Sequence, residues 1–163
     1  MKALIFQSDF GLCDGAVAAM HGVAYSEDPN LKIYNLTHDI PQYDIWEASY
    51  RLIQSISFWP SGSVFVSVVD PGVGSRRRSV VAKTSTGQLI VTPDNGTLTH
   101  VKKMLGIEEV RLLEETKNHL PIKELSYTFH GRDVYVYTAA RLATGKITFE
   151  QVGKKLPNKV VEI

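Results

Sequence analysis

The run at residues 63–69 constrains the fold of this chain more than any other segment. Its residues are apolar on both faces toward the end of the run, and Asp70, Pro71 and Gly72 follow directly. A strand that is apolar on both faces is typical of a sheet covered by helices on both sides. The run therefore predicts a buried central strand that delivers a carboxylate to a glycine-containing turn.

Strand-like and helix-like segments alternate along the rest of the chain. The patterns predict strands at residues 3–8, 31–36 and 109–113, and helices at residues 14–27, 44–59, 97–105 and 133–143. Residues 79–84 and 88–92 are predicted to form a hairpin. This order predicts an α/β fold, a three-layer α/β/α sandwich with a mostly parallel central sheet. Residues 1–153 are expected to form one domain and residues 154–163 a linker.

Charge and cysteine content exclude several classes of protein. The 163 residues include 18 Lys and Arg against 17 Asp and Glu, so a general nucleic-acid-binding surface is not expected. A single cysteine, Cys13, cannot form an intrachain disulfide and fits a reducing compartment. The first residues are predicted as a strand rather than a signal peptide, and no apolar run approaches the roughly 20 residues that span a bilayer. We expect a cytoplasmic protein that binds neither nucleic acid nor membrane.

Two carboxylates follow predicted strands directly. Asp9 follows the first strand and Asp70 the central strand, and ligands of open α/β sheets bind beyond the carboxyl ends of strands. Asp9 is predicted to accept the hydrogen bonds of a ribose diol or to cap the following helix. Asp14 is interpreted first as a helix cap and second as a ligand contact. Acids at strand ends also hold Mg²⁺ in many enzymes, so a metal-dependent phosphohydrolase is an alternative.

Four other candidate side chains, polar or aromatic, lie in turns or loops between the predicted strands and helices. Arg77 lies far enough after Asp70 to fold back onto it, as part of an active site or as a structural ion pair. His130 differs from the other histidines because it lies between an aromatic residue and a glycine at a turn. Tyr43 is interpreted as a stacking residue or as packing at the sheet edge, and Asn95 first as a turn residue and second as a rim contact.

Together these segments resemble one enzyme family. The matching stretches are Ser8-Asp9-Phe10-Gly11-Leu12 with Asp14, Asp70-Pro71-Gly72-Val73-Gly74 with Arg77, Pro93-Asp94-Asn95-Gly96, and Phe129-His130-Gly131-Arg132-Asp133. Their order and spacing resemble the S-adenosyl-L-methionine (SAM) hydroxide adenosyltransferases, the adenosine-forming SAM hydrolases, which are related to SAM-dependent fluorinases and chlorinases.

The resemblance implies the hydrolysis of SAM to adenosine and L-methionine, without a cofactor or a metal. It implies that Asp70, Arg77 and His130 position and activate a water molecule and that Asp9 holds the ribose hydroxyls. Further substrate contacts are implied at Asp14, Tyr43, Asn95, Phe129 and Gly131.

The resemblance also implies a homotrimer in which SAM lies between this domain and a neighbouring subunit's C-terminal β-barrel. Residues 154–163 are then expected to lead toward that barrel. A non-catalytic domain that binds SAM or adenosine, or only trimerises, is one alternative, and a halogenase is another. Water is preferred over a halide as the nucleophile because the carboxylate of Asp70 would repel an anion.

Overall fold

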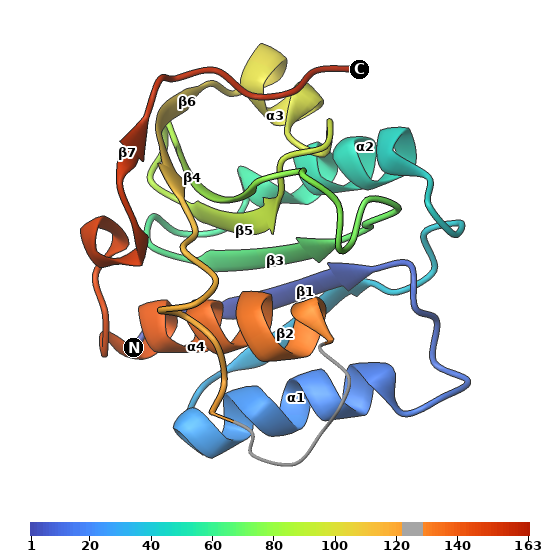
Figure 1. Cartoon of the computed structure of the whole chain (residues 1–163), viewed down its shortest axis with the longest axis vertical. Helices are drawn as coiled ribbons and strands as arrows, with labels where there is room; N and C mark the ends of the chain where they lie inside the picture. The colour runs from blue at the N-terminus through green and yellow to red at the C-terminus, as the bar shows by residue number, and fades with distance from the viewer. Residues whose placement is uncertain (122–128) are drawn as a thin grey trace.

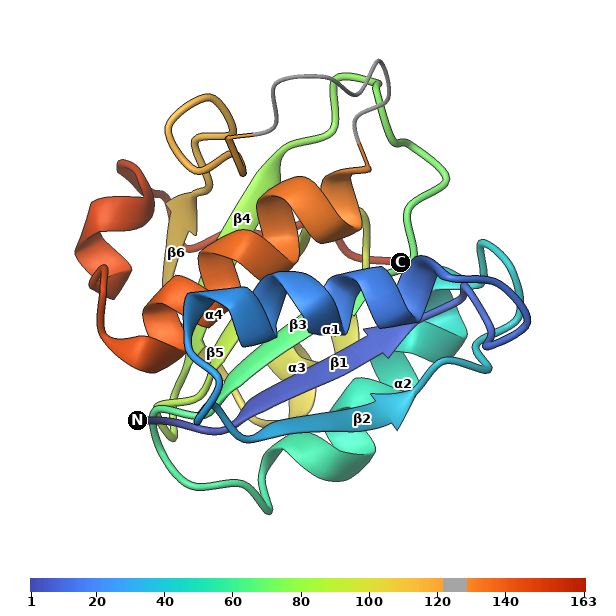
Figure 2. The ribbon, with the colours of Figure 1, turned by 90° about the horizontal axis from the view of Figure 1, so that it is seen from below.

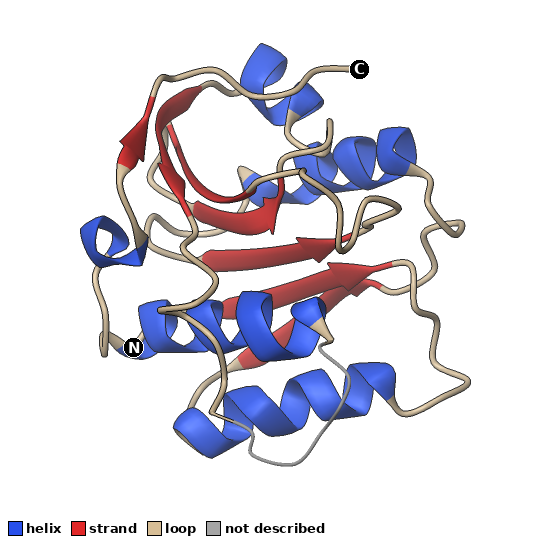
Figure 3. Cartoon of the chain, viewed as in Figure 1, coloured by secondary structure: helices blue, strands red, loops and turns tan. Residues whose placement is uncertain are grey.

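A seven-stranded sheet lies between two layers of helices in the computed structural model, which describes residues 1–121 and 129–163 (Figures 1 and 3). The strands are β1 (Leu4–Ser8), β2 (Ile33–Thr37), β3 (Val64–Val68), β4 (Ser79–Thr84), β5 (Leu89–Pro93), β6 (Ile107–Leu112) and β7 (Lys155–Leu156). The α-helices are α1 (Ala16–Glu27), α2 (Ile45–Ile56), α3 (Thr99–Met104) and α4 (Tyr137–Thr144). A π-helix, η1 (Gly131–Val136), precedes α4, and a 3₁₀-helix, η2 (Phe149–Val152), follows it.

The sheet is mixed rather than mostly parallel. Its strand order is β2-β1-β3-β5-β4-β6-β7, and the first four strands in this order pair in parallel. β4 is antiparallel to both β5 and β6, and β6 is antiparallel to β7. The α/β fold is confirmed, but the expectation of a mostly parallel sheet is not fully met, because three of the six strand pairs are antiparallel. The physical reason is the tight turn at residues 85–87, which includes Gly87 at a φ of 95° and reverses the chain without a crossover helix.

The reversed direction of β4 has a consequence for the edges of the sheet. Ser79, the first residue of β4, pairs with Pro93, the last residue of β5. The beginning of β4 therefore lies at the same edge as the carboxyl ends of β1, β3, β5 and β6. The segment that enters β4 and the segments that leave β1, β3, β5 and β6 therefore meet at this edge.

The helices cover the two faces of the sheet in pairs. Figure 2 shows α1 and α4 in front of the sheet, with α2 and α3 behind it. Alternate residues of β1 point to opposite faces, as the pleat requires. Phe6 packs in the same cluster as Met20 of α1, while Ile5 packs with Leu52 of α2. All four side chains are buried, so the central strands are covered on both faces as predicted.

The ends of the helices follow local sequence signals, with one exception. The side chain of Asp44 accepts a hydrogen bond from the backbone N–H of Glu47 at 3.0 Å and caps α2. Gly145 ends α4 at a φ of 81°. The helix predicted at residues 133–143 instead begins as the π-helix η1. There the carboxylate of Asp133 accepts the backbone N–H of Phe129 at 3.0 Å, and a wide turn of this kind is common beside functional sites.

The segment at residues 154–163 contacts the domain along much of its length. Leu156 pairs with Val110 in β6, and the side chain of Val160 is buried. The backbone N–H of Val161 donates to the carboxylate of Asp94 at 2.9 Å. In Figure 1 the C-terminus lies beside α3, to which the N–H of Ile163 donates a hydrogen bond. The division into a domain at residues 1–153 and a linker stays a prediction.

In the described parts of the chain, every helix is too short or too polar to cross a lipid bilayer.

Candidate functional site

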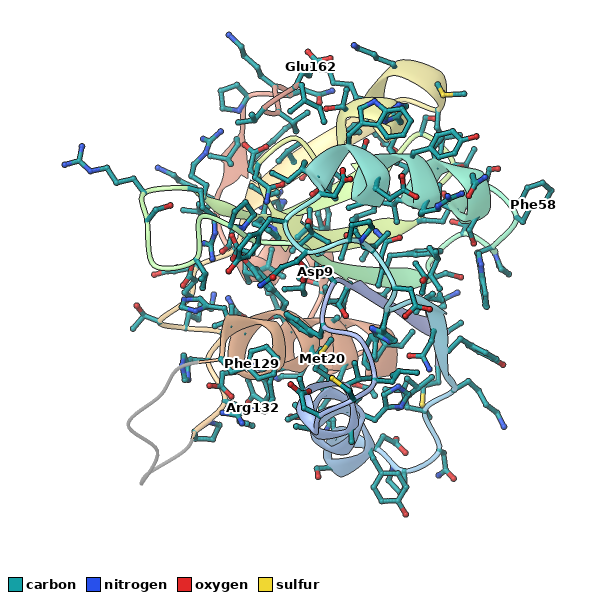
Figure 4. The ribbon with its side chains drawn as sticks, turned by 90° about the vertical axis from the view of Figure 1, so that its right-hand side faces the viewer. Asp9, Met20, Phe58, Phe129, Arg132 and Glu162 are labelled. Atoms are coloured by element: carbon teal, nitrogen blue, oxygen red, sulfur yellow. The ribbon has the colours of Figure 1, made fainter. Side chains whose placement is uncertain are left out.

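Two acidic side chains lie at the edge of the sheet where the carboxyl ends of the parallel strands meet. Asp9 directly follows β1, and Asp70 follows β3, its neighbour in the sheet. Figure 4 looks onto this edge and shows Asp9 near the middle, with Phe129 below it and to the left. Ligands of open α/β sheets bind at such an edge.

A cleft with a volume of about 560 Å³ opens at this edge. Its volume suits a small organic molecule. Most of the residues that the sequence predicted as catalytic or substrate-binding line it, namely Asp9, Asp14, Tyr43, Asp70, Phe129, His130 and Gly131. Segments far apart in the sequence therefore come together around one cavity.

The carboxylate of Asp9 fixes an unusual backbone conformation at the rim of the cleft. Its Oδ2 accepts the backbone N–H of Tyr43 at 2.8 Å. Tyr43 has a φ of 64°, which is uncommon for an aromatic residue, and its side chain is exposed. Within the described residues, Oδ1 of Asp9 accepts no hydrogen bond. This oxygen is therefore free to accept a hydrogen bond from a hydroxyl group of a ligand.

Asp14 combines a structural contact with a position in the cleft. Its Oδ1 accepts the backbone N–H of Ala16, the first residue of α1, at 2.9 Å. The side chain is exposed and also lines the cleft. Both interpretations of Asp14 therefore have an observation behind them.

Asp70 and Arg77 form a buried, two-pronged ion pair. Arg77 Nη2 lies 2.7 Å from Asp70 Oδ2, and Arg77 Nε lies 3.1 Å from Oδ1. Only 5% of the Asp70 side chain and 10% of the Arg77 side chain are exposed, so water screens this pair weakly. Arg77 does not line the cleft itself but is paired with Asp70, which does. Gly72 permits the close turn, because a Cβ atom there would lie 3.2 Å from Arg77 Cγ.

Burial alone would lower the pKa of Arg77. The hydrogen bonds that Arg77 donates to Asp70 and the charges of nearby groups outweigh burial, so the pKa of Arg77 lies above its ordinary value. The guanidinium therefore stays positively charged beside the cleft.

A buried hydrogen-bond network continues from Arg77 into the domain. Arg77 Nη1 donates to Ser79 Oγ at 3.1 Å, and Ser79 Oγ donates to Glu115 Oε2 at 2.8 Å. The hydroxyl of Tyr135 lies 2.8 Å from the same Ser79 oxygen. Since Ser79 gives its single proton to Glu115, the Tyr135 hydroxyl must be the donor. Burial raises the pKa of the Tyr135 phenol, which keeps this donor neutral.

His130 joins this network through Glu115. His130 Nε2 lies 2.9 Å from Glu115 Oε1, while Glu115 Oε2 lies 3.4 Å from Arg77 Nη1. Among the described residues, His130 makes no direct hydrogen bond to Asp70 or Arg77. The three residues predicted as catalytic are therefore brought together at one edge, with a fourth side chain between the guanidinium and the imidazole.

Aromatic side chains form an apolar wall beside His130. The rings of Phe10 and Phe129 meet edge to face, with 5.2 Å between their centroids. The guanidinium of Arg132 lies 5.5 Å from the Phe129 centroid, and Figure 4 shows these two residues side by side. At Gly131 a Cβ atom would lie 2.9 Å from the Phe129 ring and 3.4 Å from the Phe10 ring. The absence of a side chain at Gly131 therefore lets the wall close.

Asn95 is not brought into the lining of the cleft. Its amide donates to the backbone carbonyl of Val69 at 2.8 Å, and its Oδ1 accepts from the hydroxyl of Thr97 at 2.7 Å. Val69 directly precedes Asp70. Asn95 thus braces the backbone that carries Asp70, and its predicted substrate contact stays a prediction.

Several residues at the site were not predicted as site residues from the sequence. They are Glu115 and the cleft-lining Phe10, Ala16, Gln42, Val68 and Val73. Gln42 and Val73 line the cleft beside residues that were predicted. Glu115 follows β6, and the same strand-end signal that pointed to Asp9 and Asp70 was present there. Because Glu114 also follows β6, the signal alone could not choose between the two acids.

The metal-site alternative has no donor cluster in the described residues. Across residues 1–121 and 129–163, no group of three or more His, Cys, Asp or Glu side chains is arranged to hold a metal ion. Asp70, one of the two acids in the cleft that follow strands, is already paired with Arg77.

Known proteins similar to this chain share its sequence over most of its length. Residues 4–153 match the family model described as the SAM hydroxide adenosyltransferase N-terminal domain. The (R)-S-adenosyl-L-methionine hydrolase of Methanocaldococcus jannaschii is 38% identical over 146 residues, which cover 87% of this chain and 53% of the relative. A fluorinase of Nocardia brasiliensis is more distant, at 27% identity over 94% of this chain and 57% of the relative.

A solved structure has the same fold. The uncharacterized conserved protein from Thermotoga maritima superimposes with a TM-score of 0.91 at 34% identity, over 98% of this chain and 60% of that protein. The chain spans about half the length of the curated relative from Methanocaldococcus jannaschii.

Proposed function

The chain belongs to the SAM hydroxide adenosyltransferase family, and from this premise we propose that its protein hydrolyses SAM to adenosine and L-methionine. The observation that carries the proposal is the cleft, where Asp9, Asp70 and His130 from three distant segments surround one cavity. In this proposal Asp9 binds the ribose hydroxyls, and Asp70, Arg77 and His130 activate the water.

In this reaction the nucleophile needs activation, whereas the leaving group does not. Water attacks the ribose C5′ while the sulfonium leaves as a neutral thioether, so the leaving group needs no general acid. Bulk water is a poor nucleophile, with a pKa of about 15.7. The site must therefore orient the water and stabilise hydroxide character as it develops. The fixed positive charge of Arg77 supports such a role, and the imidazole of His130 adds a hydrogen-bonding group.

The apolar wall supports the same reaction. Phe10, Phe129 and Val68 line the cleft together with His130. In this proposal their apolar side chains exclude water from around the reacting atoms. In such surroundings the attraction between a hydroxide-like oxygen and a sulfonium is stronger than in bulk water. Residues that never touch the water can thus raise its reactivity.

A halogenase is the competing function, because fluorinases are among the relatives. Asp70 favours water over a halide, since its carboxylate lines the cleft and would repel an anion. The identity of the hydrolase relative is also higher, at 38% against 27%.

We further propose that the protein works as a cytoplasmic homotrimer in which a neighbouring subunit's C-terminal β-barrel completes the pocket. The share of the relatives that this chain covers supports a second domain, since residues beyond the match make up nearly half of the hydrolase relative. Light scattering on the full-length protein would test the trimer, and a monomer that retains activity would contradict it.

The reaction can be tested by supplying SAM to the full-length protein in ¹⁸O-labelled water. We expect equal amounts of adenosine and methionine, with the label in the 5′-hydroxyl of adenosine, as read by chromatography and mass spectrometry. The Asp70→Ala variant should lose most of this activity, whereas Asp39→Ala, which removes an exposed carboxylate after β2, should retain it.

The other possible outcomes separate the rival functions. A halogenated nucleoside formed on addition of chloride or fluoride would favour a halogenase. Loss of activity with a chelator would favour a metal-dependent hydrolase. Binding of SAM without any product would indicate a non-catalytic module, and unchanged turnover by Asp70→Ala would contradict the role of that residue.

A further inference from the structure

Glu115 is the only side chain among the described residues that forms an ion pair with both Arg77 and His130. It lies in the loop after β6, at the same edge as the cleft. Oε1 of Glu115 is 2.9 Å from His130 Nε2, and Oε2 is 3.4 Å from Arg77 Nη1. Ser79 Oγ donates a third hydrogen bond to Oε2 at 2.8 Å. One carboxylate oxygen therefore contacts the imidazole, and the other contacts Arg77 and Ser79.

The contact with Glu115 determines which nitrogen of the imidazole carries the proton. An ionised carboxylate only accepts hydrogen bonds, so Nε2 must be the protonated nitrogen. In the neutral imidazole the free electron pair then lies on Nδ1. Nδ1 is buried and has no hydrogen-bond partner within the described residues. His130 lines the cleft, so a bound molecule there would satisfy this nitrogen once the imidazole shifts enough to expose it.

The surroundings of Glu115 keep its carboxylate ionised. Burial raises the pKa of Glu115, but the hydrogen bond from Ser79, the interaction with His130 and the charge of Arg77 outweigh burial and lower the pKa. The other ionisable groups near it are Asp70, which is held by Arg77, and Tyr135, a neutral phenol. His119 lines a second cavity together with Glu115 and His130. The ionised form is thus the one that faces the imidazole.

Resting on the hydrolase function proposed above, we propose that Glu115 is a positioning residue that holds His130 in the Nε2–H tautomer, so that Nδ1 takes the proton of the attacking water. The water oxygen forms a bond to C5′ while the bond from C5′ to sulfur breaks, and the electron pair of that bond stays on sulfur. One water proton moves to Nδ1, and the other remains on the 5′-hydroxyl of adenosine. The carboxylate of Glu115 stabilises the imidazolium that forms.

Asp70 is less suited to take this proton. Both of its oxygens already accept hydrogen bonds from Arg77, at 3.1 Å to Oδ1 and 2.7 Å to Oδ2. Asp70 is therefore assigned to orienting the water, and His130 to removing its proton.

The first experiment compares two variants of neighbouring acids in the full-length protein. Glu115→Gln keeps the shape of the side chain but removes its charge, and we expect kcat for adenosine release to fall roughly 100-fold with little change in KM. Glu114→Gln removes the same charge from the adjacent, exposed residue and should leave both constants unchanged. Equal effects of the two substitutions on kcat would overturn the proposal.

The second experiment reads the tautomer without relying on activity. Nitrogen-15 NMR of the histidine rings, with His130 assigned from a His130→Gln variant, should show the Nε2–H form in the wild-type protein. In Glu115→Ala this signal should change to a mixture of tautomers, whereas in Glu114→Ala it should not. A wild-type signal from the Nδ1–H form, or an unchanged signal in Glu115→Ala, would overturn the positioning role.

The two experiments separate failure of this proposal from failure of the proposed function. If the wild-type protein releases no adenosine, the hydrolase function and the proton transfer to Nδ1 are both overturned. The NMR result then decides alone whether Glu115 positions the imidazole. If the protein is active but Glu115→Gln retains wild-type kcat, only the role of Glu115 is lost.

Discussion

At the scale of single residues, the cleft depends on glycine at a position where no side chain fits. Gly131 lies against the rings of Phe10 and Phe129, and a Phe129 ring atom would be 2.9 Å from an added Cβ. A contact this short forces the Phe129 ring to move. The edge-to-face pair that walls the cleft is therefore sensitive to a single methyl group.

We predict that Gly131→Ala displaces Phe129 and weakens substrate binding. The cost in unfolding free energy should be about 1–3 kcal/mol, the usual range for overpacking. KM for SAM should rise in steady-state assays of the full-length protein. Gly15→Ala is the control, because an added Cβ at Gly15 meets no atom within 4 Å. Equal KM values for the two variants would contradict the steric argument.

The same scale shows what could be predicted from the sequence at the site. Asp9 and Asp70 were predicted because an acid directly after an apolar strand is a local pattern. The contact between Glu115 and His130 joins residues from different loops, so no local pattern contains it. Asn95 shows the reverse case, since a turn motif suggested a ligand contact while its amide supports the backbone before Asp70.

At the scale of elements, two glycines occupy different positions in helices, one in the interior of α1 and one at the end of α4. Gly145 ends α4 with a φ of 81°, a conformation that costs other residues about 1 kcal/mol. Gly22 lies within α1, where alanine is preferred over glycine by roughly 0.5–1 kcal/mol. An added Cβ meets no atom within 4 Å at either position, so packing does not obscure the comparison.

We therefore predict opposite effects of the same substitution. Gly145→Ala should lower the melting temperature by roughly 2–4 °C, and Gly22→Ala should raise it by a similar or smaller amount. Differential scanning calorimetry of the two variants measures both. A loss of stability in both variants would show that the backbone conformation is not the deciding factor.

The elements themselves, and the hairpin of β4 and β5, were mostly predictable, while the order of the strands in the sheet was not. Apolar periodicity and turn residues located β1, β3, α2 and the hairpin of β4 and β5 close to their observed bounds. Whether β4 lies beside β3 or beyond β5 depends on pairing between distant strands, which the local pattern does not contain. The π-helix η1 was missed for a similar reason, because Asp133 and Phe129 widen a turn whose apolar spacing still resembles an α-helix.

At the scale of the whole molecule, a buried histidine links stability to pH. His38 is 5% exposed, and its Nδ1 lies 2.6 Å from the hydroxyl of Ser8, beside the turn that carries Asp9. Burial, and then the charge of His21, lower the pKa of His38 below its ordinary value of 6.5. His38 therefore binds a proton less readily in the folded protein than in the unfolded chain.

We predict that the protein loses stability as the pH falls below about 6.5, and that His38→Gln reduces this loss. Between the ordinary pKa and the lowered one, the unfolded state binds more protons, so the contribution of His38 is complete above 6.5 and is lost toward the folded pKa. One proton accounts for at most about 1.4 kcal/mol per pH unit. Urea unfolding at pH 7, 6 and 5 measures the slope, and parallel curves for the two proteins would refute the assignment.

The reversed direction of β4 also affects how such a protein can change during evolution. The segment between β3 and β4 starts and finishes at one edge of the sheet, and Asn95 and Asp94 hold its two ends. Insertions or deletions at residues 71–76 would reshape the surroundings of the attacking species without shifting any strand. Changes confined to residues 71–76 could therefore alter which nucleophile the enzyme uses during evolution, while the sheet and its helices stay unchanged.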